Sequence, residues 1–314
     1  MRLSNQRDGA FSVSLALILA FAGLPACSSS DSKDKTPSGS QNADGGSNGT
    51  DSGADDAPLP VLPEALEECP TLATGTMNIL GQPVNLFVGE RQEDKKGPIL
   101  FYWHGTYSQP EEANAFMQKQ IDEIVAEGGM VASFGGTQGT GEYTGPFVWY
   151  LDDFKMTDQL VACAVKQLNI DTRRIYSAGC SAGGLQTGTM AYERSSYVAG
   201  VMTISGGIGN LRQFQDESHI PNVISSHGAP GKDVVILDFS GTSTLFDGDI
   251  VAHGGFAVDC NHGGGHCGTP QDIIAAQWQF LKDHPFGVHP EPYASGLPSS
   301  FPSTCQIYTP TDGG

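Results

Sequence analysis

The sequence has few basic residues. Of 314 residues, only 16 are Lys or Arg, against 35 Asp or Glu, and the formal net charge is −19. Nucleic-acid phosphates require a basic surface, so this balance excludes nucleic acid as a partner. Charged residues make up only 16% of the chain and hydrophobic residues 39%, which is enough for one large hydrophobic core. The composition fits an exported protein that works outside the cytosol.

Long apolar runs are absent after the N-terminus. The run over residues 11–24 is too short and too poorly flanked for a stable transmembrane span. It ends in Leu24-Pro25-Ala26-Cys27, which resembles a bacterial lipobox, where the cysteine is lipidated. We therefore expect a lipoprotein signal peptide over residues 1–26 and a lipid on Cys27 as the only membrane contact. The protein would then be anchored at the outer membrane or cell surface, or be extracellular; the alternative is an ordinary signal peptide with a chance cysteine.

Cysteine is sparse, but its number is informative. Apart from Cys27, the chain has Cys69, Cys163, Cys180, Cys260, Cys267 and Cys305. An even number in an exported chain predicts disulfides rather than free thiols. Six cysteines allow 15 pairings, and the sequence does not choose among them.

Apolar side chains are also scarce between the signal peptide and the first folded segment. Residues 27–65 are mostly polar and small and are expected to be a disordered tether. Over residues 66–290, short apolar runs alternate with amphipathic stretches, which predicts an α/β domain whose mostly parallel sheet carries helices on both faces. Residues 291–314 form a Pro- and Ser-rich tail that is expected to follow the surface.

The apolar periodicity gives approximate bounds for each element of this domain. Strands are expected at 77–88 (a hairpin), 98–103, 129–134, 174–178, 198–204, 221–226 and 256–260, and helices at 111–127, 152–168, 185–193, 240–252 and 272–282.

One motif indicates nucleophilic catalysis. Gly179-x-Ser181-x-Gly183 follows an apolar strand and begins a helix. A serine nucleophile needs an exposed tight turn, a neighbouring base and nearby backbone amides, and the glycines permit that turn. A second match, Gly45-x-Ser47-x-Gly49, lies in the polar tether without a strand or helix beside it. The context therefore favours Ser181 as the nucleophile.

A second motif, His104-Gly105-Thr106-Tyr107, ends an early apolar strand. Serine hydrolases take one oxyanion donor from the residue after the nucleophile and another from the loop after such a strand. Ala182 and Thr106 are therefore the expected oxyanion donors. Tyr107 is the next candidate donor on this loop and is also an expected substrate contact. The alternative is a plain turn at the end of a strand.

The base is expected in Cys260-Asn-His262-Gly-Gly-Gly-His266-Cys267, between the last strand and the closing helix. We favour His266, which follows the glycines, over His262. The four Cys and His residues also suggest a zinc site. The glycines between the histidines argue against a helix that would align two ligands, so no metal and no other cofactor is expected.

The order serine, acid, histidine is that of α/β-hydrolases. The acid must then lie between Ser181 and His266, on a loop after a strand. Asp233 follows the strand at 221–226 and the His227-Gly228 turn. Asp247 and Asp249 are the alternatives if the strand instead runs from Val234.

These motifs together resemble those of polyhydroxybutyrate depolymerases and feruloyl or acetylxylan esterases over residues 75–285. The resemblance rests on Arg174-Ile-Tyr-Ser-Ala-Gly-Cys-Ser181-Ala-Gly-Gly184, on the preceding Asn169-Ile-Asp-Thr-Arg173, on Gly264-Gly-His266, and on His227-Gly228 through Asp233. The acid loop is longer than the family's, and Cys180 is not its usual residue before the nucleophile. The resemblance implies hydrolysis of a small or polymeric ester through an acyl-enzyme, without a cofactor.

Other functions remain open at this point. A serine peptidase of the prolyl-oligopeptidase type shares the motif around the serine, although no accessory domain precedes the core. A non-catalytic binding lipoprotein with a hydrolase fold would usually have lost the nucleophile or the base. Trp149 and Tyr150 are candidate substrate contacts, and the alternative for both is a place in the core.

Overall fold

The computed structural model describes residues 58–310 of the chain. The signal peptide, Cys27 and most of the expected tether lie outside the described residues, as do residues 311–314. Across residues 58–310, no helix is both long enough and apolar enough to cross a membrane.

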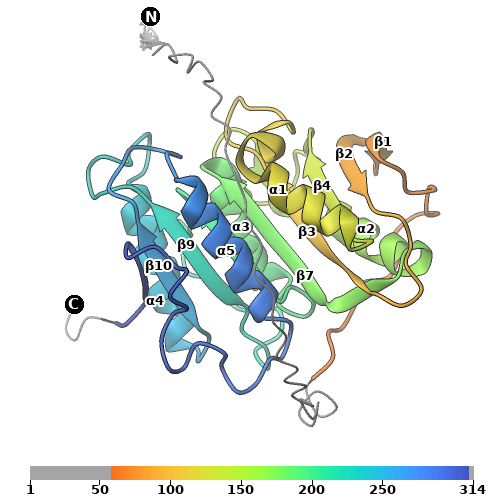
Figure 1. Ribbon diagram of the computed structural model, residues 1–314. Coiled ribbons are helices and arrows are strands. Elements are labelled where there is room, and N and C mark those ends of the chain that lie inside the picture. Colours follow the sequence, from red (N-terminus) through yellow and green to blue (C-terminus); the bar gives the residue numbers. More distant parts are fainter. Residues whose placement is uncertain (1–57, 311–314) are drawn as a thin grey trace, which may run out of the picture. The chain divides into compact units, whose positions relative to one another are not determined.

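A nine-stranded sheet runs through the described part of the chain (Figure 1). Within this sheet the six strands β4, β3, β7, β8, β9 and β10 are parallel to one another, whereas β1, β2 and β11 pair antiparallel at the two edges. In their order across the sheet the strands are β1 (Gly75–Ile79), β2 (Gln82–Val88), β4 (Met130–Phe134), β3 (Gly97–Trp103), β7 (Ile170–Cys180), β8 (Gly200–Ile204), β9 (Asn222–His227), β10 (Ala257–Asn261) and β11 (Cys305–Ile307).

Helices cover both faces of this sheet, as expected for an α/β domain. The helices α1 (Glu112–Ala126) and α5 (Gln271–Asp283) lie in front of the sheet in Figure 1 and share one apolar core with it. On the other face, a second core joins the sheet to α2 (Phe154–Gln167), α3 (Ala182–Glu193) and α4 (Phe239–Ala252). A 3₁₀ turn, η1 (Leu151–Asp153), precedes α2, and a small hairpin joins β5 (Tyr143–Gly145) to β6 (Trp149–Tyr150).

The central strands are apolar on both faces, because helices cover both. Every residue of β3, β4 and β8 is buried. Such continuous apolar runs are typical of parallel strands inside α/β proteins. The expected elements match the observed ones closely, except that β7 begins at Ile170 rather than Arg174. The first residue of β7, Ile170, pairs with Gly97 of β3, but polar residues 171–174 interrupt the apolar pattern before Ile175, so apolar periodicity does not reveal this contact.

The C-terminal tail differs from the expectation. Instead of only following the surface, it contributes β11, which pairs antiparallel with β10. A disulfide joins Cys260 of β10 to Cys305 of β11. The sequence does not show this strand because it has only three residues in a Pro- and Ser-rich segment. The tail expected over 291–314 is thus part of the sheet at residues 305–307.

All six cysteines of the described residues form disulfides: Cys69–Cys163, Cys180–Cys267 and Cys260–Cys305. The first ties the segment before β1 to α2. The second joins the end of β7 to the loop before α5. Three disulfides favour an oxidising compartment outside the cytosol.

Candidate active site

The candidate residues lie at the carboxyl ends of parallel strands. Ser181 directly follows β7, Asp233 lies on the loop after β9, and His266 lies on the loop after β10. Because parallel strands end at the same edge of a sheet, side chains that follow them converge there, and this edge is where open α/β sheets bind ligands.

The turn at Ser181 explains the two glycines of its motif. Ser181 has φ 58° and ψ −120°, a conformation that non-glycine residues rarely adopt. A Cβ atom on Gly183 would lie 1.8 Å from the carbonyl oxygen of Trp103, and one on Gly179 would lie 2.4 Å from that of Gly183. Only glycine fits at either position, so β7 and α3 can meet closely enough to expose the Ser181 hydroxyl at the edge of the sheet.

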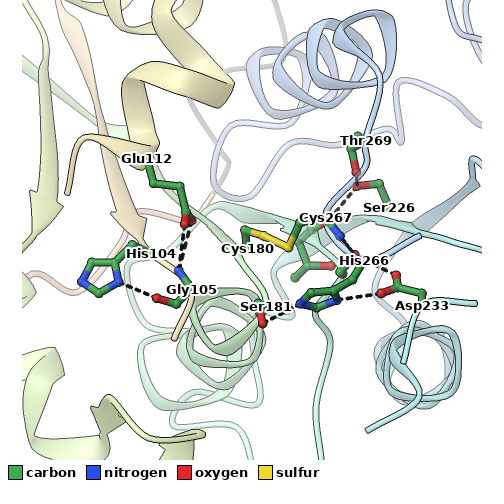
Figure 2. The surroundings of a disulfide bond; sticks show 12 residues. His104, Gly105, Glu112, Cys180, Ser181, Ser226, Asp233, His266, Cys267 and Thr269 are labelled. Carbon is green, nitrogen blue, oxygen red and sulfur yellow. Dashed lines mark hydrogen bonds and ion pairs between the residues drawn. A yellow bond between two sulfur atoms is a disulfide. The ribbon is translucent and has the colours of Figure 1, made fainter. Parts of the chain in front are cut away.

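Three side chains form a continuous hydrogen-bonded chain (Figure 2). The Ser181 Oγ lies 2.8 Å from His266 Nε2, and His266 Nδ1 lies 2.7 Å from Asp233 Oδ1. The ring of Phe239, the first residue of α4, packs 4.6 Å from that of His266. This is the geometry of a Ser-His-Asp triad, in which the base can take the serine proton while the acid holds its other nitrogen.

The surroundings of Asp233 stabilise its ionised form. The side chain is fully buried. Burial opposes ionisation, but hydrogen bonds from His266, the Gly228 amide and the Ser205 hydroxyl together keep the pKa of Asp233 below its usual value. The Gly228 nitrogen lies 2.8 Å and the Ser205 Oγ 2.7 Å from Asp233 Oδ2. Asp233 can therefore accept a hydrogen bond from the imidazolium form of His266 while its own carboxylate stays ionised.

A disulfide lies beside the triad. Cys180 precedes Ser181 and Cys267 follows His266, so one covalent bond joins the neighbours of the two residues (Figure 2). The backbone amide of Cys267 also donates to Ser205 Oγ at 2.8 Å. The loop that carries His266 is thereby fixed to β7 and to the end of β8.

The loop after β3 faces Ser181 from the other side. The Gly105 amide donates to the Glu112 carboxylate at 3.1 Å, and the Thr106 hydroxyl donates to the carbonyl of Pro146 at 2.6 Å. Ala182 is the first residue of α3, so its amide has no acceptor within the helix. Thr106, Ser181 and His266 line one open cavity of about 260 Å³. Thr106 thus lines the same cavity as Ser181, and Ala182 directly follows Ser181 at the start of α3.

Comparison with solved structures identifies the fold. Native pOPH superposes with a TM-score of 0.59 at 16% identity, covering 78% of this chain and 98% of that one, and native sOPH with 0.56 at 16%, covering 77% and 96%. A thermostable esterase gives 0.51 at 18%, covering 67% of this chain and 62% of the other. The chain has the α/β-hydrolase fold. No protein-family model and no curated protein matches its sequence.

The α/β-hydrolase fold agrees with the fold class expected from the sequence, but one of the expected substrate contacts is wrong. Trp149 is completely buried, donates from Nε1 to the carbonyl of His104 at 2.9 Å, and packs edge-on against Trp103. Its indole packs against the start of the loop after β3. Because the side chain is completely buried, it cannot contact a substrate. Tyr150 is partly exposed and packs against Tyr143, while Tyr107 is 88% exposed.

The alternative site residues lie elsewhere in the fold. Asp247 is buried on α4 and accepts from Ser225, and Asp249 accepts from Tyr192. His262 accepts the Gly264 amide at Nδ1, whereas it is His266 that contacts Ser181 Oγ. The sulfurs of Cys260 and Cys267, two of the four suggested zinc ligands, are both consumed in disulfides.

Several residues that support the site were not predicted from the sequence. Ser205 binds Asp233, Glu112 binds the Gly105 amide, and the ring of Phe147 stacks on that of Tyr107 at 6.4 Å. Ser205 precedes Gly206-Gly207 at the end of β8, and this turn was the available signal. Glu112 and Phe147 reach the site only through the packing of α1 and of the β5–β6 hairpin.

Proposed function

We propose that this protein is a serine hydrolase that cleaves carboxylic esters through an acyl-enzyme. The observation that carries the proposal is the chain of contacts from Ser181 Oγ through His266 to Asp233, on a strained turn at the carboxyl edge of the sheet. A serine hydroxyl is a weak nucleophile until a base accepts its proton, and this geometry provides the base.

The reaction would proceed in two halves. Ser181 Oγ attacks the ester carbonyl carbon while His266 Nε2 takes its proton, and Asp233 stabilises the imidazolium. The amides of Ala182 and Thr106 would bind the negative oxygen of the tetrahedral intermediate. When the intermediate collapses, the C–O bond to the alcohol breaks and His266 protonates the leaving oxygen. Water then attacks the acyl group by the same steps and releases the acid.

For the substrate class, we propose a polyhydroxyalkanoate or a feruloyl- or acetyl-substituted polysaccharide, consistent with the sequence resemblance. The cavity at Ser181 is small and open, which leaves room for a long chain to cross it. Tyr107 stands exposed next to Thr106 and is the proposed contact for such a chain; partly exposed Tyr150 is a second. One of the pOPH structures is a complex with pNPB.

Turnover of p-nitrophenyl acetate and butyrate tests the activity, and a serine-directed fluorophosphonate should abolish it. A panel of feruloyl, acetylated-xylan and hydroxybutyrate esters then separates the substrate classes. Cleavage of a peptide amide at a rate comparable to that of the esters would instead favour a serine peptidase. No labelling by the fluorophosphonate and no turnover would favour a non-catalytic binding protein.

We also propose that the protein is exported and held on a membrane by a lipid on Cys27. The motif Leu24-Pro25-Ala26-Cys27 and the polar segment that follows support this, and the three disulfides suit an oxidising compartment. A single acyl chain anchors only marginally, so more than one chain is expected on the cysteine. Cys27→Ser should move the protein from the detergent phase to the aqueous phase, and equal partitioning of both forms would contradict the anchor.

A further inference from the structure

His227, the last residue of β9, is a buried histidine outside the triad. Its Nδ1 lies 2.7 Å from the carbonyl oxygen of Gly228, and its Nε2 lies 2.8 Å from Asp259 Oδ1. A carbonyl oxygen and an ionised carboxylate only accept hydrogen bonds, so both ring nitrogens must donate. The two contacts are satisfied together only by an imidazolium ion.

The contacts of His227 lead directly to the triad. The Gly228 residue whose carbonyl binds the ring donates its own amide to Asp233 Oδ2 at 2.8 Å. A Cβ atom on Gly228 would lie 2.2 Å from the carbonyl oxygen of Gly264, so this peptide is packed against the loop that carries His266. The backbone carbonyl of His227 also accepts the amide of His262 at 3.0 Å.

We propose that His227, held as an imidazolium by Asp259, is a positioning residue that fixes the Gly228 peptide and through it the carboxylate of Asp233. The proposal rests on the hydrolase function proposed above, since it concerns the geometry of that triad. An unbroken series of contacts runs from Asp259 through His227, Gly228, Asp233 and His266 to Ser181. A small displacement of a catalytic group costs on the order of 100-fold in rate, so a fixed Gly228 amide matters for turnover.

The carboxyl groups of Asp259 and Asp247 favour protonation of His227, whereas a charge on His262 opposes it. Asp259 comes from β10, Asp247 from α4 and Tyr308 from the segment after β11, and His262 follows β10. Burial works against the charge, but the Asp259 carboxylate outweighs it and the pKa of His227 is raised above its usual value. Because the pKa is raised, the imidazolium persists to higher pH than that of an ordinary histidine and is lost as the pH rises further. Either the Gly228 or the Asp259 contact then loses its donor.

Two substitutions separate the roles of the two ring nitrogens. The amide nitrogen of asparagine takes the place of Nδ1, and that of glutamine takes the place of Nε2. His227→Asn should keep the Gly228 contact and most of the turnover. His227→Gln should keep the Asp259 contact and lose about tenfold or more in kcat with little change in KM, because the acid is misplaced while the substrate cavity is intact.

His284 provides a matched control. It is also buried, with Nδ1 at 2.7 Å from the carbonyl of Phe280 and Nε2 at 2.8 Å from Glu291 Oε1. It lies at the opposite end of β7 from Ser181, where the Phe286 amide donates to the carbonyl of Arg173. His284→Gln should lower the midpoint of thermal unfolding without changing kcat.

The primary measurement is the rate at which a fluorophosphonate labels Ser181, because it reports the triad without requiring a known ester. His227→Gln should be labelled about tenfold or more slowly than wild type, and His227→Asn nearly as fast. Equal labelling of wild type and His227→Gln, or an equal loss in His284→Gln, would overturn the positioning role. If the wild type is labelled but hydrolyses no ester, the proposed substrate class fails and the positioning role is still tested.

Asp259→Asn adds a readout that a purely structural role would not move. Without the carboxylate the pKa of His227 should fall, so the alkaline decline of the labelling rate should begin at lower pH than in wild type. This variant also decides the question if His227→Gln does not fold. An unchanged pH profile would contradict the proposal.

Discussion

His104 and His227 make the same contact: in each, ring Nδ1 lies 2.7 Å from the carbonyl oxygen of the glycine that follows. In each case the amide of that glycine donates to a carboxylate, from Gly105 to Glu112 and from Gly228 to Asp233. The two His-Gly turns end two parallel strands on either side of β7. One turn leads into the proposed oxyanion loop and the other into the loop of the proposed acid, so the same local geometry shapes both sides of the site.

Replacing Glu112 should therefore weaken the oxyanion loop. Glu112→Ala leaves the Gly105 amide and the Tyr102 hydroxyl without their shared acceptor. The loop that carries Thr106 should then lose its fixed position, and kcat should fall by about 10- to 100-fold with the fold retained. Glu111→Ala is the control, because the Glu111 side chain accepts a hydrogen bond from the Asn85 amide and not from the loop after β3. Equal rates in the two variants would contradict a role for Glu112.

Ser181→Ala should abolish ester hydrolysis while the protein remains folded. Loss of a triad serine costs on the order of a million-fold in turnover. The comparison is kcat for p-nitrophenyl butyrate together with the far-ultraviolet circular dichroism of both forms. Ser47→Ala, in the other Gly-x-Ser-x-Gly match, should hydrolyse the ester at the wild-type rate. A folded Ser181→Ala protein with substantial activity would show that another residue is the nucleophile.

Of the three candidate acids, Asp233 should be the sensitive one. Asp233→Asn should lower kcat by about 10⁴-fold, because the amide cannot stabilise the imidazolium of His266. Asp247→Asn and Asp249→Asn should stay near wild type, since these side chains bind Ser225 and Tyr192 instead. A silent Asp233→Asn would refute the assignment of the acid.

Asp247 should make stability depend on pH. Burial raises its pKa well above the usual value; the Ser225 hydrogen bond opposes this and the nearby Asp259 adds to it. A carboxyl whose pKa is raised on folding stabilises the fold while it is protonated, and this stabilisation is lost as the pH rises through the folded-state pKa. Relative to wild type, the free energy of unfolding of Asp247→Asn should therefore increase as the pH rises from about 4. Urea unfolding of both proteins at several pH values measures this difference in the free energy of unfolding. A difference that does not change with pH would contradict the prediction.

The Cys180–Cys267 disulfide should matter for turnover as well as for stability. Removing a native disulfide typically costs about 2–5 kcal/mol of stability. Cys180→Ala/Cys267→Ala should in addition lower kcat, because the loop of His266 loses its link to β7. Cys69→Ala/Cys163→Ala removes a disulfide away from the triad and should affect only the unfolding midpoint. Equal kcat values for the two double variants would show that the first disulfide serves stability alone.

Local sequence patterns predicted most of the strands and helices, and also the three loops that carry Ser181, Asp233 and His266. Apolar runs located the strands, and the strand-turn-helix context separated Ser181 from Ser47 because a strained turn needs both neighbours. The helix after Asp233 was predicted with Leu245, Ile250 and Val251 facing inward. It is present as α4, but of these three only Ile250 is fully buried and Leu245 is 40% exposed, so that part of the prediction is wrong. The structure brings the three proposed triad residues within hydrogen-bonding distance of one another.

What the sequence did not reveal depends on tertiary contacts. The disulfide pairing follows from which strand ends meet, and β11 exists only because β10 offers a free edge. Trp149 was expected near the substrate because aromatic residues often line clefts, yet it packs on Trp103 beneath the loop. Ser205 and Glu112 carry no motif of their own, and their role arises from the elements packed beside them.

The position of the Cys180–Cys267 bond has a consequence for how the protein matures. The two cysteines are separated by 87 residues in the sequence, so the first emerges from the ribosome well before its partner. Cytosolic reductants keep such thiols apart, and oxidation begins only after export. On the proposed export route, the link between the neighbours of Ser181 and His266 would form only after secretion, so the proposed triad would reach its fixed geometry outside the cytosol.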